Sequence, residues 1–413
     1  MLRKVDDTGT TTSVYGAGRW RRVAIGVVAL MTLLGSACGS TDDPADEAAS
    51  VASGTTDTGA DSGAPDGSDV PYPSPDWPLA EPQDHGLDPA ELDDLAAYFE
   101  SINSTCTVVI KDGHLVDSRY WNGTTIDTNQ EIWSISKSIT SVLIGVAQTR
   151  GLLDIDDPAS DYIEEWRGTP SEGVTIRNLV SNDSGRYYSH VSDSGLVAAE
   201  DQTGYALALD QQHPPGSHWD YNSAAIQTLE AVLENATGGS VEEFAQEHLF
   251  GPLGMSATIR DDDAGNDLMY MGTQAGCDDI ARFGYLALHG GAWDGEQVVS
   301  RPWMTEATSA SQDLMTGYGF LWWRNTDGRH YILEEAVGDE RTDYPNDMQR
   351  VLVDDGSAFF PSAPADLVVG AGIQDQLLLV VPSEDLVIVR LGGLGGPGDF
   401  LTLIDEVFTR VTL

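Results

Sequence analysis

Basic side chains and cysteines are scarce in this chain of 413 residues. It carries 21 Lys and Arg against 66 Asp and Glu, which gives a formal net charge of −45. Because a polyanion repels phosphate groups, this composition argues against nucleic acid or an anionic lipid surface as a partner. The 3 cysteines are too few for a disulfide scaffold and lack the paired spacing of a zinc site. We expect neither a metal nor another cofactor.

Two further patterns are missing from the chain. No Gly-x-Ser-x-Gly sequence occurs, which argues against the nucleophile elbow of an α/β-hydrolase. The apolar run over 23–34 is shorter than the roughly 20 residues that a membrane-spanning helix needs. These absences exclude two common architectures and leave the motifs of the chain itself to indicate its chemistry.

The first residues predict a secretory signal of the lipoprotein type over 1–37. Three arginines within 19–22 precede the apolar run over 23–34, and small residues follow at 35–37. A basic segment, a short apolar segment and small residues are typical of an export signal. Cys38 then resembles the acylated cysteine of a bacterial lipobox. We expect Cys38 to anchor the protein to the bacterial membrane on its extracytoplasmic side; a short uncut membrane anchor is the alternative.

The segment 38–76 is rich in Gly, Ser, Thr, Ala, Asp and Pro and has few large apolar residues. Such a segment cannot bury enough apolar surface to offset its ordering entropy, so it predicts a disordered acidic linker. The remaining chain, 77–413, predicts one folded domain that the linker holds away from the membrane.

Patterning over 77–413 predicts helices and two hairpins, one near each end of the domain. The predicted elements are a helix over Glu91–Glu100 capped by Asp88, a hairpin of Thr107–Ile110 with Leu115–Tyr120, helices over Ile132–Arg150, Gly204–Asp210, Ala224–Thr237, Val241–His248 and Asp278–His289, a hairpin of Gln376–Val381 with Leu386–Leu391, and a helix from Phe400. Strands at both ends with helices between them indicate an α+β fold. We expect an antiparallel sheet formed by both chain ends, flanked by helices, with a helical subdomain.

Ser134 and Lys137 form a Ser-x-x-Lys sequence at the start of the predicted helix over Ile132–Arg150. Residues three apart on a helix share a face, with about 5–6 Å between their Cβ atoms. Burial among apolar neighbours lowers the pKa of a lysine, and only the neutral amine can act as a base. Downstream of the signal the chain has only Lys111 and Lys137. This pair predicts an activated serine; the alternative is a lysine that snorkels from a surface helix.

Two later segments carry further candidate residues. Tyr221 and Ser223 lie two apart on a loop before a predicted helix, where a phenol can relay a proton. The segment Gly370-Ala371-Gly372 leads through Ile373 to Gln376 and the penultimate predicted strand, where glycines allow close approach of a substrate. A buried tyrosine at a turn and an ordinary β-bulge are the respective alternatives.

In this order, Ser134-x-x-Lys137, Tyr221-Asn222-Ser223 and the Gly-rich strand entrance resemble the serine β-lactamase and penicillin-binding-protein family. Within that family, the chain is most similar to the class C-like esterases and amide hydrolases. The resemblance covers about 77–413 and implies the β-lactamase/transpeptidase-like fold.

The resemblance also implies roles. Ser134 forms an acyl-enzyme, Lys137 is the general base, and Tyr221 assists the proton transfer. The N–H of Ser134 and an N–H near Ile373 form the oxyanion hole, with Ser223, Gly372 and Gln376 beside the substrate. Two departures matter: Ser223 replaces the family's Asn, and Gly370-Ala371-Gly372 has neither the cation nor the hydroxyl of Lys-Thr-Gly.

Those departures favour esters, or amides without the β-lactam carboxylate, as substrates. An exported protein meets oxidising conditions, so we also expect a disulfide between Cys106 and Cys277; two unpaired buried thiols are the alternative.

The sequence thus leads to the hypothesis of an exported, lipid-anchored serine hydrolase, acting as a monomer on a small ester, amide or peptide, with no nucleic-acid partner. A non-catalytic lipoprotein that binds cell-wall peptides and a D,D-peptidase are the alternatives. Substrate choice is expected to depend on loops such as Asp339–Asp366.

Overall fold

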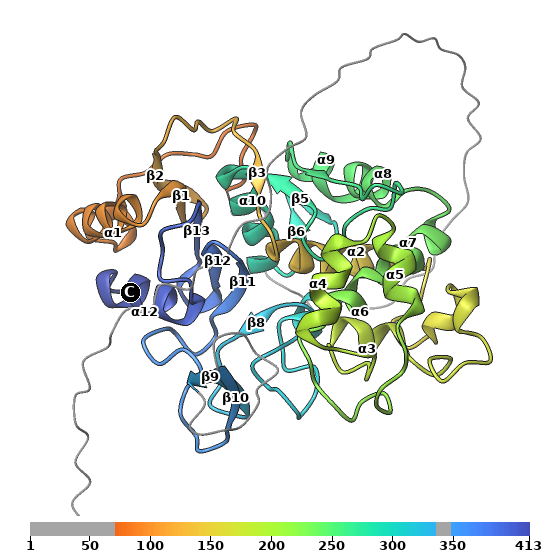
Figure 1. Ribbon diagram of the computed structural model, residues 1–413. Helices are drawn as coiled ribbons and strands as arrows, with labels where there is room; N and C mark the ends of the chain where they lie inside the picture. The colour runs from red at the N-terminus through yellow and green to blue at the C-terminus, as the bar shows by residue number, and fades with distance from the viewer. Residues whose placement is uncertain (1–70, 336–347) are drawn as a thin grey trace, which may run out of the picture. The chain divides into compact units, whose positions relative to one another are not determined.

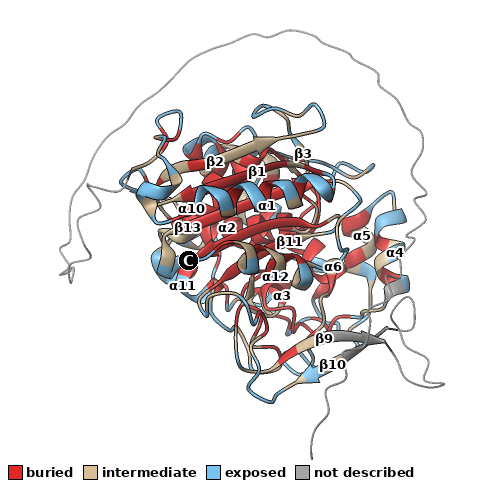
Figure 2. Ribbon diagram, turned by 90° about the vertical axis from the view of Figure 1, so that its left-hand side faces the viewer, coloured by how far each residue is buried: buried red, intermediate tan, exposed pale blue. Residues whose placement is uncertain are grey.

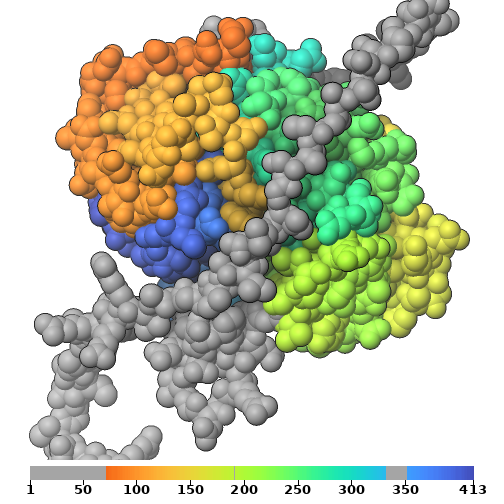
Figure 3. Space-filling view, turned by 45° about the horizontal axis from the view of Figure 1, so that its top comes forward, coloured from red at the N-terminus to blue at the C-terminus, as the bar shows by residue number. Residues whose placement is uncertain are grey.

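A six-stranded antiparallel sheet organises the computed structural model, which describes residues 71–335 and 348–413 (Figure 1). Its strands, in spatial order, are β2 His114–Tyr120, β1 Ser104–Lys111, β13 Leu386–Gly392, β12 Gln376–Val381, β11 Val368–Gly372 and β8 Trp323–Arg324. Strands β1 and β13, from opposite ends of the described chain, pair directly from Ser104↔Gly392 to Lys111↔Leu386. Figure 3 shows these two ends, in orange and blue, side by side on one face. The prediction of a sheet formed by both chain ends is confirmed.

Helices cover both faces of this sheet. They are α1 Pro89–Ser101 and α12 Phe400–Arg410 on one face, and α2 Ile135–Thr149 and α10 Cys277–Leu288 on the other (Figure 2). Every residue of β12 and of β13 is consequently buried. This explains why these strands are continuous apolar runs rather than alternating ones. The structure confirms the predicted α+β class and both predicted hairpins.

A helical subdomain follows α2 along the chain. It contains α3 Ile176–Val180, α4 His190–Ala198, α5 Gln202–Ala208, α6 Ser223–Gln227, α7 Leu229–Thr237, α8 Val241–Ala245 and α9 Gly251–Leu253. The single helix predicted over Ala224–Thr237 is divided at Thr228, whose Oγ1 donates to the carbonyl of Ala225 at 2.6 Å. Such a side-chain bond competes with the helical ladder. The helix predicted over Val241–His248 likewise changes to a π-helical turn at Gln246–Phe250.

Several short elements were not predicted from the sequence. They are β3 Gln130–Glu131, β4 Thr258–Ile259, β5 Thr273–Ala275, β6 Ala292–Trp293, β7 Glu296–Gln297, α11 Arg301–Ala307, β9 His330–Glu335 and β10 Met348–Val353. Hairpin β9–β10 flanks residues 336–347, so part of the loop predicted to choose the substrate lies outside the described residues. The segment Gly370-Ala371-Gly372 ends β11 and does not enter the penultimate strand, which starts at Gln376.

The N-terminal segment 71–76 contacts the folded body. Tyr285 donates its hydroxyl to the carbonyl of Pro71 at 3.0 Å, and Arg282 donates to that of Pro75 at 2.5 Å. The Tyr72 ring packs edge-on against Tyr285. The body therefore begins before Trp77, within what was predicted to be linker. The predicted signal, Cys38 and the rest of that linker lie outside the described residues.

The structure joins Cys106 of β1 to Cys277, the first residue of α10, with 6.2 Å between their Cα atoms. This disulfide ties the first strand of the sheet to a helix that covers it. Among the described residues, we find no helix with the length and apolar character needed to cross a membrane.

Candidate active site

The chain turns sharply between β3 and α2, and Ser134 lies at this turn. Trp133 has a φ of 51°, a left-handed conformation that is uncommon for a bulky residue, and α2 begins at Ile135. This is why the helix begins later than the predicted Ile132. Ser134 is the residue that precedes the helix, and its side chain makes no capping hydrogen bond. Its hydroxyl is therefore available for chemistry.

Lys137 is buried one turn further along α2, with 1% of its surface exposed. Its Nζ lies 2.9 Å from Ser134 Oγ and donates to the carbonyl of Tyr270 at 3.0 Å. Burial lowers the pKa of Lys137 to about 7, while the charge of Asp193 acts in the opposite direction. A large fraction of the amine is therefore neutral at neutral pH, and its lone pair can face the serine hydroxyl.

Tyr221 completes a cluster around the serine hydroxyl. Its phenol is hydrogen-bonded to Ser134, and its ring centroid lies 4.8 Å from Lys137 Nζ. On the other side the ring stacks on Trp323 of β8, with 5.5 Å between centroids. Burial raises the pKa of Tyr221 well above its usual value, so the phenol keeps its proton at neutral pH. The structure thus brings Ser134, Lys137 and Tyr221 together.

The loop that carries Tyr221 is fixed by its neighbour Asn222. The Asn222 side chain caps α6 by accepting from the N–H of Ala225 at 3.0 Å, and it donates to the carbonyls of Arg186 and Tyr187. Ser223 is the first residue of α6 and is half-buried; its hydroxyl makes no hydrogen bond to another described residue. The middle residue of this motif is therefore structural, and the Ser223 hydroxyl remains open to a ligand.

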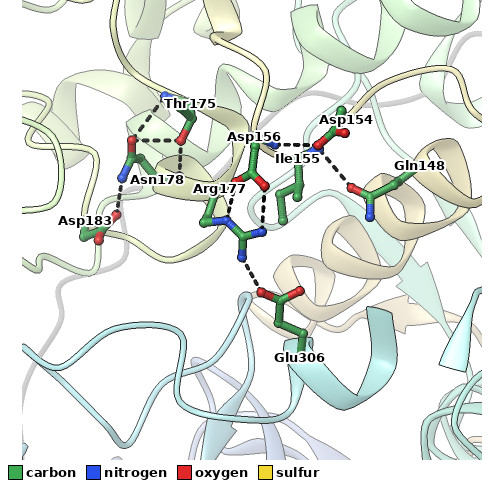
Figure 4. A network of polar contacts seen from close by, with 9 residues as sticks. All are labelled: Gln148, Asp154, Ile155, Asp156, Thr175, Arg177, Asn178, Asp183 and Glu306. Carbon is green, nitrogen blue, oxygen red and sulfur yellow. Dashed lines mark hydrogen bonds and ion pairs between the residues drawn. The ribbon is translucent and has the colours of Figure 1, made fainter. Parts of the chain in front are cut away.

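A polar network around α3 connects to the same loop through Asp183 (Figure 4). Arg177 of α3 donates to Asp156 at 2.6 Å and also pairs with Glu306 of α11. The adjacent Asn178 donates to Asp183 Oδ1 at 2.9 Å, and the Asp183 carbonyl accepts from Gly216, at the start of the Tyr221 loop. Helices α3 and α11 thus hold the segment on which the Tyr221 loop rests.

The end of strand β11 lies close to the backbone of Ser134. A Cβ at Gly372 would be 2.6 Å from the carbonyl oxygen of Ile132 and 3.0 Å from the nitrogen of Ser134, so only glycine fits without a shift. Ile373 follows with 62% of its surface exposed. Neither the Ser134 N–H nor the Ile373 N–H donates to an acceptor among the described residues. These two N–H groups have the properties of an oxyanion hole.

Gln376, predicted to lie beside the substrate, is occupied elsewhere. Its amide donates to the carbonyl of Gly392 at 2.6 Å and accepts from the N–H of Gly392 at 2.9 Å. The side chain is 1% exposed. Both ends of the amide are therefore used to join β12 to β13, and we assign Gln376 to the sheet rather than to the substrate.

Two residues near Lys137 were not found from the sequence. Tyr270 contributes its backbone carbonyl, an atom that every residue type has, so the sequence carries no signal for it. Asp193 of α4 has a buried Oδ1 with no hydrogen-bond partner among the described residues. Burial raises the pKa of Asp193 to about 6, although Lys137 lowers it. A lone aspartate on a short helix likewise gives no sequence signal.

Chemically, this arrangement joins the Ser134 hydroxyl, a buried amine, a protonated phenol and two N–H groups that donate to no acceptor among the described residues. These are the parts needed for nucleophilic attack on a carbonyl group. Among the described residues, no group of three or more His, Cys, Asp or Glu side chains is arranged to hold a metal ion.

Comparisons with known proteins find hydrolases among the relatives of this chain. The 6-aminohexanoate-dimer hydrolase of Paenarthrobacter ureafaciens is 23% identical over 331 residues, covering 72% of this chain and 75% of the relative. Esterase EstB of Burkholderia gladioli is 29% identical over 150 residues, covering 31% of this chain and 38% of the relative.

A crystal structure of a β-lactamase/D-alanine carboxypeptidase from Pseudomonas syringae has the same fold. Its TM-score is 0.57 at 16% identity, and the match covers 78% of this chain and 98% of that one. The family model for Beta-lactamase matches residues 92–399, which hold the sheet, α2 and the Tyr221 loop. The chain therefore belongs to the Beta-lactamase family and shares the fold of the β-lactamase/D-alanine carboxypeptidase.

Proposed function

We propose that this protein is a serine hydrolase that cleaves an ester or amide bond through an acyl-enzyme on Ser134, with Lys137 as the general base. The observation that carries the proposal is the distance of 2.9 Å between Ser134 Oγ and the buried Lys137 Nζ. A surface lysine that snorkels to solvent would not have 1% exposure or this partner.

Acylation follows from the positions of these atoms. The Ser134 Oγ–H proton moves to the neutral Lys137 Nζ as Oγ bonds to the substrate carbonyl carbon, and the carbonyl oxygen becomes an oxyanion. The N–H groups of Ser134 and Ile373 donate to that oxyanion. When the intermediate collapses, the bond to the leaving group breaks. The proton on Lys137 then passes to the leaving group, directly or through the Tyr221 phenol.

Deacylation repeats these steps with water. Lys137 accepts a proton from the attacking water, whose oxygen bonds to the acyl carbon. The bond to Ser134 Oγ then breaks, and the serine oxygen regains its proton. Because Tyr221 and Lys137 both lie beside Ser134, the same proton path serves both halves of the reaction.

The proposed substrate class rests on the side chains at the end of β11, next to Ser134. Gly370, Ala371 and Gly372 have no charged or hydroxyl side chain, so this strand provides no side-chain group for a substrate carboxylate. A neutral ester or amide at this edge is therefore favoured over a penicillin. Among the relatives, one is named a 6-aminohexanoate-dimer hydrolase and another an esterase, which supports hydrolysis of an amide or an ester bond.

We further propose that the protein acts outside the cytoplasm as a lipoprotein attached through Cys38. The basic, apolar and small-residue order of 19–37 supports this location. The change Cys38→Ser is expected to move the protein from the membrane fraction to the soluble fraction. A wild-type protein found in the soluble fraction without acyl mass on its N-terminal peptide would contradict the anchor.

A fluorophosphonate probe followed by peptide mass mapping tests the catalytic proposal. We expect one added mass on the peptide containing Ser134, and its loss in Ser134→Ala. The matched control is Ser141→Ala, because Ser141 is buried on the same helix and its hydroxyl has no hydrogen-bond partner in the described part of the chain. No labelling of the folded wild type at pH 6–9 would overturn the proposal and favour a non-catalytic binding protein.

A further inference from the structure

The turn between β11 and β12 is held in an unfavourable backbone conformation. Gln374 has a φ of 64° and Asp375 a φ of 62°, two consecutive residues other than glycine in the left-handed region. This conformation is unfavourable for residues other than glycine, and two in succession are rare. A turn of this kind persists only if its surroundings fix it. The turn directly follows Ile373, whose N–H we assigned to the oxyanion hole.

Arg390 of β13 provides that fixation. Its Nη1 donates to the carbonyl of Gln374 at 2.8 Å and to that of Asp375 at 2.7 Å. The side chain has 0% exposure. Burial lowers the pKa of Arg390 to about 10, so the guanidinium still carries its charge at neutral pH. Hydrogen bonds from a charged group are stronger than neutral ones, and one charge here holds both carbonyls of the strained turn.

The other donors of Arg390 fix the guanidinium itself. Nε donates to Ser104 Oγ at 2.7 Å, and Nη2 donates to the carbonyl of Ile102 at 3.2 Å. Both partners lie where the chain leaves α1 and enters β1. A Cβ at Gly392 would come within 2.4 Å of Nη2, so the glycine leaves room for the guanidinium. The Nε and Nη2 side of the guanidinium is therefore fixed by Ser104 and Ile102, and this directs Nη1 at the turn.

We propose that Arg390 is a positioning residue for the oxyanion hole, which holds the Gln374 and Asp375 carbonyls so that the Ile373 N–H points to the site of the oxyanion. Arg390 lies in the sheet and contacts the turn, not Ser134. This inference rests on the proposed function, because it assumes that an oxyanion forms next to Ser134. The side of the turn towards Gly372 is fixed independently by its close approach to Ser134.

The test compares Arg390→Met and Arg390→Lys with the wild type on a p-nitrophenyl ester. Arg390→Met should lower kcat about 10- to 100-fold, which is less than the roughly 10²- to 10³-fold loss on removing one oxyanion-hole donor, because the Ile373 N–H is displaced and not removed. KM should change less than about threefold. Phenylboronic acid forms an adduct on the serine whose oxygen mimics the oxyanion, so its inhibition constant should rise in parallel with the loss of kcat. Arg390→Lys keeps a charge near the carbonyls and should recover part of both losses.

The control variant is Arg282→Met. Arg282 is also buried and donates to the backbone carbonyls of Leu253 and Pro75, but it lies on α10 and contacts neither the turn nor Ser134. Arg282→Met should lower the melting temperature, but it should not lower kcat selectively while KM stays nearly unchanged. Amide hydrogen exchange gives a readout without substrate: the peptide containing Ile373–Asp375 should exchange faster in Arg390→Met than in Arg282→Met.

Distinct outcomes separate the two proposals. If the wild type reacts with neither ester nor fluorophosphonate, the proposed function fails, and the role of Arg390 fails with it. If the wild type reacts, but Arg390→Met resembles Arg282→Met in kcat, boronate inhibition and exchange, only the role of Arg390 is overturned. If Arg390→Met does not fold, Arg390→Lys decides: unchanged kcat and unchanged boronate inhibition would refute the inference.

Discussion

Two walls of the active site work in opposite ways. The helix wall, formed by Ser134 just before α2 and by Lys137 of α2, supplies side-chain atoms that lie 2.9 Å apart. The strand wall, formed by Gly372 and Ile373 at the end of β11, supplies backbone atoms, and its closest residue to Ser134 has no side chain at all. One wall is defined by which groups it carries, the other by where its backbone lies.

This difference predicts how each wall responds to change. Substitution in the helix wall removes a reacting group, so the loss of rate should be large even when the fold is unaffected. Substitution in the strand wall shifts donors by a fraction of an ångström, so the loss should be smaller and concentrated in the transition state. The variants below test this contrast in order of decreasing expected effect.

The largest effect is expected for Lys137→Met in the helix wall. Without the amine no group accepts the Ser134 proton, so kcat/KM for a p-nitrophenyl ester should fall about 10³-fold or more. Burial of an amine is unfavourable, so a methionine of similar length should not lower the melting temperature. A variant that retains more than about a tenth of the wild-type rate would show that another group is the base.

Tyr221→Phe should have the second-largest effect and lower kcat about 10- to 100-fold. The phenyl ring keeps the stacking on Trp323, and only the proton relay and the hydrogen bond to Ser134 are lost. The loss should be larger for an amide than for a p-nitrophenyl ester, because an amine must be protonated to leave. Equal losses for both substrates would assign Tyr221 to positioning Ser134 instead. Tyr205→Phe, which removes a hydroxyl that donates to the backbone carbonyl of Ser192, is the control.

The contrast between the walls also explains what the sequence revealed. Ser134, Lys137 and Tyr221 could be predicted as candidates because reactive side chains must be of particular types and at helical or loop spacing. The sheet of both chain ends was found because buried strands are continuous apolar runs between turn residues. Fold and helix wall were therefore accessible from local patterns.

The sequence could not indicate contacts made by backbone or across the sheet. The contact to Tyr270 uses its backbone carbonyl, which every residue type has, so no residue identity indicates it. Gln376 was placed at the substrate because it follows the Gly-rich segment, whereas pairing with Gly392 across β12 and β13 decides its role. Arg390 contacts a turn 15 and 16 positions earlier in the chain. Such partners follow only from the strand register.

The strand wall is tested by Gly372→Ala. The added Cβ would lie 2.6 Å from the Ile132 carbonyl, so β11 and the Ile373 N–H must move away from Ser134. We expect kcat to fall about tenfold, less than for either helix-wall change, with KM nearly unchanged. Gly370→Ala is the matched control, because its Cβ would meet Ile135, Leu378 and Ser138 only at the ordinary distance of 3.5 Å. Similar losses in the two variants would assign the effect to the sheet as a whole.

The smallest effect is expected from Asp193→Asn, and it should be visible only in the pH profile. Ionised Asp193 raises the pKa of Lys137 against the stronger effect of burial, which brings it to about 7. Since the neutral amine is the active form, activity falls as the pH drops through that pKa. Removing the negative charge lowers the pKa of Lys137 further, so the acidic limb of kcat/KM should move to lower pH by less than about one unit.

The direction in which the acidic limb moves is the decisive observation. It depends on Asp193 being charged when ionised and Lys137 being charged when protonated. At pH 8 Lys137 is mostly neutral in both proteins, so their rates should agree there, whereas near pH 6.5 the variant should be the faster enzyme. Glu200→Gln removes an exposed negative charge just beyond the end of α4 and should leave the profile unchanged. A limb displaced to higher pH, or an equal loss of rate at every pH, would show that Asp193 acts on the substrate or the fold. The amine of the helix wall would then be tuned by burial alone.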